Sequence, residues 1–161
     1  MTPFPLPRLG AMAAACALLL PSMAQSRPVT ITTQLKNYGG DDAYLAVYLT
    51  SAQGAYAGTL WVAGRKAKYY KHLGEWNRLS ATDNQRLLGI TGASVGPGRT
   101  LKVTADLADA LLDAGYEIRI DAAAEDMRDS PAEVRLPLSQ TQAGQPLAGK
   151  QYIQSMRFDL P

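Results

Sequence analysis

His72 is the only histidine in this 161-residue chain, and that scarcity limits the chemistry available to it. A nucleophilic serine or cysteine needs a general base beside it, most often a histidine. A zinc site needs several converging ligands, and the sequence contains no HxxH, HxxxH or CxxC spacing. We therefore expect no catalytic constellation and no metal centre, although the His72 imidazole is a candidate ligand for haem iron or another metal. The alternative is a solvated or partly packed histidine on a basic helix.

Two pairs of adjacent carboxylates, Asp41-Asp42 and Glu125-Asp126, are the next candidates for chemistry. A carboxylate pair hydrolyses a glycoside only when its two members face one cleft from separate elements. Both pairs lie in turn-forming segments, where Asp favours hydrogen bonds to nearby backbone. The sequence therefore predicts solvated loop charges at both places.

A cluster of basic and aromatic residues lies between Arg65 and Trp76. Cations interleaved with aromatic rings favour a surface for an anionic partner, such as a phosphate or an acidic protein face, with the rings packed inward. The predicted partner surface consists of Arg65, Lys66, Lys68, Lys71, His72 and Trp76. The alternative is a charged face that is solvated and binds nothing.

The stretch LLGITGASVGPG, residues 87–98, carries two hydroxyl groups, on Thr91 and Ser94, among closely spaced glycines. It is not a phosphate-binding P-loop, because the Lys-Ser/Thr ending is absent and no helix follows directly. Its simplest interpretation is a loop between two strands, in which glycines adopt positive φ and Pro97 stiffens the turn. The Thr91 and Ser94 hydroxyls would then bond to their own backbone.

Short runs of alternating apolar and polar residues, separated by Gly, Asp, Asn or Pro, are the strongest repeated signal after Pro28. Such runs are typical of half-buried β-strands joined by turns. The predicted strands are residues 29–37, 43–50, 57–64, 99–106, 115–126, 132–138 and 150–160. They predict an all-β fold, an immunoglobulin-like β-sandwich of about seven or eight strands with one or two short helical insertions.

Two segments differ from this strand pattern. Tyr69, Leu73 and Trp76 fall on one helical face, which predicts a helix within residues 66–80, although Gly74 weakens it. Residues 105–115 carry a similar leucine face and a glycine stop signal, which predicts either a short helix or a turn into the next strand. Residues 139–150 are polar and contain glycine and proline, so they are predicted as a flexible loop.

Residues 1–24 have the layout of a secretory signal peptide. Arg8 supplies the positive charge, residues 11–20 form an apolar run, and small residues precede the predicted cleavage after Ala24. The sequence thus predicts a single periplasmic β-sandwich domain over residues 25–161.

The signal has two further consequences. Cys16 is the only cysteine, so it either serves as the anchor of a lipoprotein or, in the main interpretation, leaves with the signal. Arg8 is one of 16 basic residues, so its loss leaves 15 against 14 acidic residues. This balance predicts no nucleic-acid partner, and no other segment is apolar enough to span a membrane.

Three segments together resemble a family of bacterial periplasmic proteins of unknown function. They are YLAVYLTSAQGAYAGTLWVAGRKAKYYKHLGEWNRL, ITGASVGPGRTLKVTAD and GYEIRIDAAAED, and the likeness extends over residues 29–138. The resemblance implies an immunoglobulin-like sandwich of the kind found in flagellar hook-capping proteins. Genes of that family tend to lie near those of PepSY-type membrane proteins and FMN transferases, often in iron-linked settings. The resemblance therefore implies a non-enzymatic accessory protein of a PepSY- and flavin-linked redox or iron-uptake system. Its implied partners are a PepSY-type inner-membrane protein and an FMN transferase.

The same resemblance gives residues 91–94 a second interpretation. Periplasmic proteins that carry covalent FMN share a short sequence motif. In order along the chain it consists of an acidic residue, two variable residues, Ser or Thr, Gly, Ala, and the Thr or Ser that accepts the FMN. Thr91, Gly92 and Ala93 match the core of this pattern and Ser94 takes the acceptor position, but Leu88 stands where the acidic residue belongs. The alternative function is thus a flavin carrier whose FMN is esterified to the Ser94 hydroxyl by a separate transferase. A structural immunoglobulin-like module and a haem or metal binder remain further alternatives.

Overall fold

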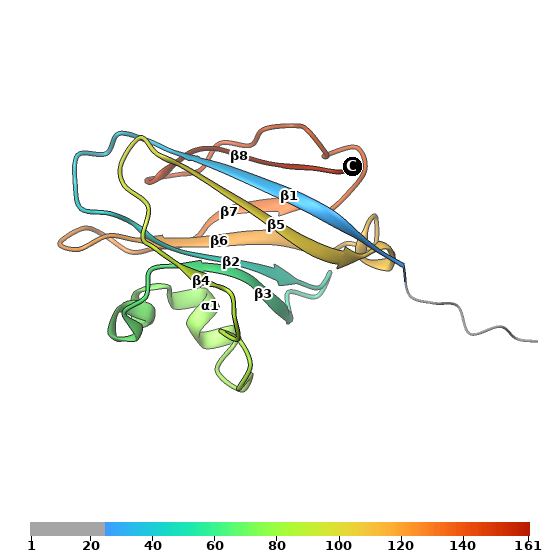
Figure 1. Cartoon of the computed structure of the whole chain (residues 1–161), viewed down its shortest axis with the longest axis horizontal. Helices are drawn as coiled ribbons and strands as arrows, with labels where there is room; N and C mark the ends of the chain where they lie inside the picture. Colours follow the sequence, from blue (N-terminus) through green and yellow to red (C-terminus); the bar gives the residue numbers. More distant parts are fainter. Residues whose placement is uncertain (1–24) are drawn as a thin grey trace, which may run out of the picture.

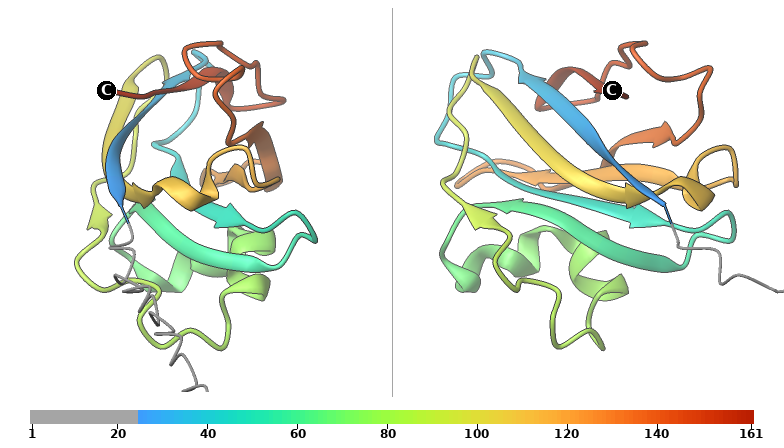
Figure 2. Two further views of the ribbon diagram at one scale, coloured as in Figure 1. Left: turned by 90° about the vertical axis from the view of Figure 1, so that its right-hand side faces the viewer. Right: turned by 45° about the vertical axis from the view of Figure 1, so that its right-hand side comes forward.

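A computed structural model of the protein describes residues 25–161; the predicted signal peptide, residues 1–24 with Cys16, lies outside the described residues. Two sheets pack against each other as two layers (Figure 1, Figure 2). The smaller sheet has the order β5 (Thr100–Ala108), β1 (Ser26–Leu35), β8 (Ile153–Asp159). The larger has the order β4 (Thr91–Gly92), β3 (Tyr56–Ala63), β2 (Tyr44–Thr50), β6 (Glu117–Ala123), β7 (Ser130–Pro137). The predicted all-β sandwich is confirmed, with β4 as an additional strand that the alternation did not predict.

The predicted helix within residues 66–80 is present as two short helices. They are the 3₁₀ helix η1 (Ala67–His72) and the α-helix α1 (Gly74–Leu79), which pack on the outer face of the larger sheet (Figure 1). Leu73, with φ −88° and ψ 68°, interrupts them. Leu73 and Trp76 of the predicted face are buried against the sheet, but the prediction is wrong for Tyr69, which is only half-buried, because the 3₁₀ turn places Tyr70 on the buried face instead.

Strand β2 belongs to two hydrophobic cores, which explains why its sequence is almost uniformly apolar. Leu45, Val47 and Leu49 face the main core between the two sheets. Ala46 and Tyr48 point the other way, into a second core beneath η1 and α1. The helical insertion therefore shields a sheet face that would otherwise meet water.

The segment 105–115, predicted as a short helix or a turn, begins as strand. β5 continues to Ala108, and only the 3₁₀ helix η2 (Asp109–Leu111) is helical. Leu107 is buried in the main core as part of the strand alternation. The helical interpretation is wrong for the first part of this segment, because its leucines belong to two different elements.

Residues 139–150, predicted as a flexible loop, form no strand but are tied to the outer edge of β8. The Gly144 N–H donates to the Phe158 carbonyl at 2.8 Å, and Leu147 and Met156 exchange two backbone hydrogen bonds of 2.8 Å. This segment therefore covers the backbone groups of β8 that would otherwise remain open.

Candidate functional site

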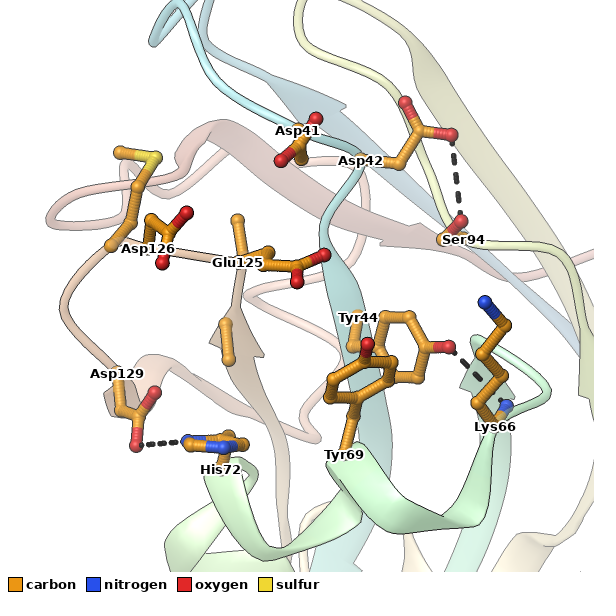
Figure 3. Close-up of a pocket in the computed structure, with 13 residues that line it drawn as sticks. Asp41, Asp42, Tyr44, Lys66, Tyr69, His72, Ser94, Glu125, Asp126 and Asp129 are labelled. Carbon is orange, nitrogen blue, oxygen red and sulfur yellow. Dashed lines mark hydrogen bonds and ion pairs between the residues drawn. The ribbon is translucent and has the colours of Figure 1, made fainter.

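A cleft of about 670 Å³ opens at one end of the larger sheet, beside η1 (Figure 3). Four parts of the chain form it: the residues before and at the start of β2, η1 with the residue before it, the residues after β4, and the end of β6 with the loop to β7. Its lining residues are Asp41, Asp42, Tyr44, Lys66, Tyr69, His72, Ser94, Ala123, Ala124, Glu125, Asp126, Met127 and Asp129. Because Tyr44 of β2 pairs with Ala123 of β6, segments distant in sequence meet at this end.

The Thr91–Ser94 stretch is held in place on both sides. Thr91 and Gly92 form β4, which pairs in parallel with the end of β3, and Val95 exchanges two backbone hydrogen bonds of 2.7 and 2.9 Å with Ala43. Gly92 is required by packing, since a Cβ at this position would lie 2.5 Å from the Trp61 ring. The stretch is thus fixed rather than a free turn, and of its four residues Ser94 lines the cleft while Thr91, Gly92 and Ala93 do not.

Ser94 points its hydroxyl into the cleft, where it donates a long hydrogen bond of 3.4 Å to Asp42 Oδ2 (Figure 3). Within residues 25–161 the Ser94 hydroxyl forms no hydrogen bond to its own backbone, so the prediction that it does is wrong. Leu88 does not face Ser94: it is 77% exposed and lines a separate hollow with Asp83 and Arg86. The carboxylate near Ser94 therefore comes from Asp42, which the sequence motif did not reveal.

Two tyrosines form the aromatic wall of the cleft. The Tyr44 and Tyr69 rings lie edge to face with centroids 5.3 Å apart, and the Tyr44 hydroxyl accepts a hydrogen bond from the Lys66 N–H at 3.3 Å. The Lys66 amino group points toward the Ser94 side of the cleft in Figure 3. Lys68 lies over the Tyr69 ring at 4.8 Å, a distance typical of a cation–π contact.

One side of the cleft is lined by acidic residues from the segment before β2 and from the loop between β6 and β7. Asp41, Asp42, Glu125 and Asp126 are exposed, as expected for loop charges, but the sequence did not predict that the two pairs share one cleft. His72 pairs with Asp129 through Nδ1 at 3.0 Å. Among the residues that the structure describes, no three His, Cys, Asp or Glu side chains are placed to hold one metal ion.

The basic segment, residues 65–71, borders the cleft on its other side. Arg65, Lys66, Lys68 and Lys71 are all exposed, and no ion pair within residues 25–161 includes any of them. The backbone beneath them is fixed by Tyr70, whose hydroxyl donates to the Gly64 carbonyl at 2.8 Å. Four cations are therefore presented to solvent by a well-packed scaffold.

Trp76 does not belong to the predicted partner surface. Its side chain is 0% exposed, packs edge to face on Tyr70 with ring centroids 5.6 Å apart, and donates from Nε1 to Thr59 Oγ1 at 2.9 Å. The prediction of Trp76 as a contact residue is wrong, because this ring fills the second core.

Residues 26–155 match a family model described as "Predicted periplasmic protein (DUF2271)". The chain belongs to this family. No curated protein and no solved structure matches the chain. As a member of the DUF2271 family the protein is periplasmic, which confirms the predicted location and the predicted family of unknown function. Among residues 25–161, no helix has the length and apolar character needed to cross a bilayer.

A buried carboxylate anchors α1 of this DUF2271 protein to the sheet. Asp121 on β6 is 0% exposed and accepts hydrogen bonds from the Trp76 N–H at 2.8 Å, the Ala132 N–H at 2.8 Å and the Tyr48 hydroxyl at 2.9 Å. Burial raises the pKa of Asp121, and these hydrogen bonds offset only part of the rise. No sequence motif marks this aspartate, yet it fixes the start of the helix next to the basic segment.

Proposed function

We propose that the protein is a non-enzymatic periplasmic accessory protein that binds an acidic face of a partner protein through its basic segment. The observation that carries the proposal is the set of four exposed cations that have no ion pair within the described residues. Following the resemblance, the proposed partner is a PepSY-type inner-membrane protein of a flavin-linked redox or iron-uptake system.

The rigidity of the basic segment supports this role. Tyr70, Leu73 and Trp76 are buried beneath it, so its backbone does not have to be ordered when a partner binds. Unpaired surface cations also steer an anionic partner during approach, and this contribution weakens as salt is added. The proposed complex should therefore be strongest at low ionic strength.

Reversing two of these charges should weaken the complex. Lys68 and Lys71 are suited to the test because neither lines the cleft. With the periplasmic part of a PepSY-type membrane protein as the probe, Lys68→Glu with Lys71→Glu should raise the Kd about tenfold at low salt, through like-charge repulsion at the interface. Titration calorimetry or biolayer interferometry at two salt concentrations measures the change.

A matched control reverses two exposed cations on the side of the smaller sheet, Arg99→Glu just before β5 with Arg157→Glu on β8, which changes the net charge equally. This control should bind within about twofold of the unaltered protein, because surface charges far from an interface contribute little. Equal weakening by both variants, or no weakening by either, would contradict the proposed surface.

The alternative function, a covalent FMN carrier, is favoured by one specific arrangement. The Ser94 hydroxyl, the Asp42 carboxylate, the Lys66 ammonium and the Tyr69 ring all border the same cleft. Tyr69 offers an aromatic surface and Lys66 a cation for a phosphate, so these two residues suit the group, whereas the carboxylates that line the same cleft repel its phosphate. Bound flavin supplies electron transfer, which none of the side chains provides.

The attachment step would use a transferase and a flavin donor that contains a pyrophosphate, such as FAD. The Ser94 Oγ forms a bond to the FMN phosphorus, the pyrophosphate bond breaks, and AMP leaves. Asp42, which accepts the Ser94 hydrogen bond, is the group placed to take the hydroxyl proton.

Co-expression with an FMN transferase tests this alternative. Intact-mass spectrometry should show the addition of one FMN, which Ser94→Ala abolishes and Thr91→Ala leaves in place. Asp42→Asn should slow attachment about 100-fold, as expected for loss of a general base. Leu88→Asp should change little, because position 88 lines a different hollow from Ser94. An unmodified protein, or full modification of the Ser94→Ala variant, would overturn this function.

A further inference from the structure

Among residues 25–161, strand β5 forms an edge of the smaller sheet and is paired on one side only. Its nine residues, Thr100–Ala108, pair with β1 in an unbroken antiparallel register, from Gln34 opposite Thr100 to Ser26 opposite Ala108. A long regular edge of this kind displays a row of backbone N–H and C=O groups to any approaching strand. Figure 2 shows β5 at the end of its sheet, beside β1.

The register decides which backbone groups of β5 point outward. The Leu35 N–H donates to the Arg99 carbonyl at 2.9 Å, and the Asp109 N–H donates to the Gln25 carbonyl at 2.8 Å. In an antiparallel ladder the residues that bond to one neighbour alternate with those that point away. Odd-numbered residues of β5 therefore bond to β1, and the N–H and C=O groups of Lys102, Thr104 and Asp106 face the open edge.

The other edges of the sandwich are protected. Residues 144–149 cover β8 through backbone hydrogen bonds. β7 contains Pro131 and Pro137 and its pairing with β6 has a register shift. β3 has two register shifts against β2 and is partly covered by β4. Proline, bulges, covering segments and edge lysines are the usual protection of sheet edges. In the described part of the chain β5 lacks the first three and has one lysine, Lys102.

We propose that the open edge of β5 binds β5 of a second copy of this chain, antiparallel and centred on Thr104, so that the two smaller sheets join into one continuous sheet. The charges on the strand support this occupant. Lys102 and Asp106 are exposed and form no ion pair within residues 25–161. They lie roughly 13 Å apart along their own strand, at about 3.3 Å per residue, and are therefore too distant to pair with each other.

Pairing centred on Thr104 makes the two strands complementary. Lys102 of each copy lies opposite Asp106 of the other, and Thr104 lies opposite itself. All three are residues with outward backbone groups, so each opposed pair exchanges two backbone hydrogen bonds. Leu101 then lies opposite Leu107 on the inner face.

Other arrangements lose this match. Sliding the register by one ladder step places Lys102 opposite Thr104 or Ala108 and removes both charge pairs. A parallel, in-register pairing places Lys102 opposite Lys102, which is repulsive. The charges therefore select one register and one direction, as polar pairs do in other self-associating strands.

A charge-swap series tests the proposal on residues 25–161 by analytical ultracentrifugation at micromolar concentrations. The unaltered protein should be dimeric. Lys102→Asp and Asp106→Lys should each raise the dimer dissociation constant about tenfold, because each creates two like-charged pairs across the twofold axis. The double variant Lys102→Asp with Asp106→Lys should restore the original constant, and an equimolar mixture of the two single variants should form a heterodimer. Within residues 25–161 neither side chain forms a hydrogen bond or ion pair, so thermal melting should stay unchanged when monomers are compared.

Amide hydrogen exchange gives a second, independent measurement. The amides of Lys102, Thr104 and Asp106 should be protected in the dimer and exchange rapidly on dilution, whereas that of Val103 should be protected in both states. A protein that stays monomeric, including one whose β5 edge accepts a strand from a different protein, would overturn the proposal. So would a dimer that neither single variant weakens.

Discussion

Replacing Asp121 by alanine is expected to lower the free energy of unfolding by about 3–5 kcal/mol, among the largest effects of any single change in this protein. The carboxylate is fully buried and accepts hydrogen bonds from the Trp76 N–H, the Ala132 N–H and the Tyr48 hydroxyl. Alanine leaves three buried donors without acceptors. Denaturant unfolding followed by tryptophan fluorescence and circular dichroism measures the change.

Asp121→Asn is the matched control, because it keeps the shape of the side chain. Its amide oxygen can accept the bonds from Tyr48 and Ala132, but its NH₂ group then faces the Trp76 N–H, so its loss of stability should be smaller than that of alanine. Loss of the anchor should also loosen the start of α1, visible as faster amide exchange at Trp76. An alanine variant within about 1 kcal/mol of the unaltered protein would contradict the role of Asp121 as an anchor.

Replacing Glu133 by alanine should have an effect of similar size, about 3–5 kcal/mol, in a different part of the fold. Glu133 on β7 is 1% exposed, and one of its oxygens accepts the N–H groups of Lys150, Tyr152 and Ile153 at 2.8–2.9 Å. The other carboxylate oxygen accepts a hydrogen bond from the Ser130 hydroxyl. This carboxylate therefore fixes the entry to β8 against the larger sheet.

Glu133 should also give the protein a specific sensitivity to acid. Burial alone would raise the pKa of Glu133, but the hydrogen bonds from Ser130 and from the backbone around Ile153 outweigh it, so the pKa lies below its ordinary value of 4.5. The folded state then holds this proton less tightly than the unfolded chain. Its stabilising contribution is complete above pH 4.5 and is lost as the pH falls through the lowered pKa.

The two buried carboxylates should be separable by their pH profiles. Glu133→Gln should flatten the loss of stability in acid, measured by urea unfolding across that range. Asp121 has a raised pKa, so its contribution declines as the pH rises above its ordinary value of 3.8, and Asp121→Asn should remove that decline. Two variants with parallel pH profiles would contradict these assignments.

The strand pattern of the sandwich could be predicted because the alternation of apolar residues reports directly on which face of a strand is buried. In β6, however, Glu117, Arg119 and Asp121 alternate with apolar residues as solvent-facing positions do. Arg119 and Asp121 are covered instead by α1, and Arg119, 8% exposed, pairs with Glu75 and with the partly exposed Glu117. Alternation identifies the two faces of a strand, but a covering helix cannot be inferred from the strand itself.

The cleft could not be predicted for a related reason. Asp42 and Glu125 are far apart in sequence, and only the pairing of Tyr44 with Ala123 brings their loops to one end of the sheet. The basic segment, by contrast, is contiguous, so its composition alone indicated an exposed charged surface. Trp76 was assigned wrongly because its neighbours in sequence are polar, while its neighbours in space are Tyr70 and Tyr48.

The short parallel pairing of β4 with β3 has a consequence for how this fold can diversify. The chain leaves the sheet after Ala63 and returns at Thr91 beside Val62, so the intervening residues form an excursion whose two ends are neighbours. The length of such a loop can change at a small entropic cost, because each doubling of its length raises the free energy of loop closure by only about 0.6 kcal/mol. The excursion can therefore be exchanged: a replacement that still covers Ala46 and Tyr48, and that supplies hydrogen-bond partners for the buried Asp121 and Arg119, can bring a new binding surface without altering the sandwich.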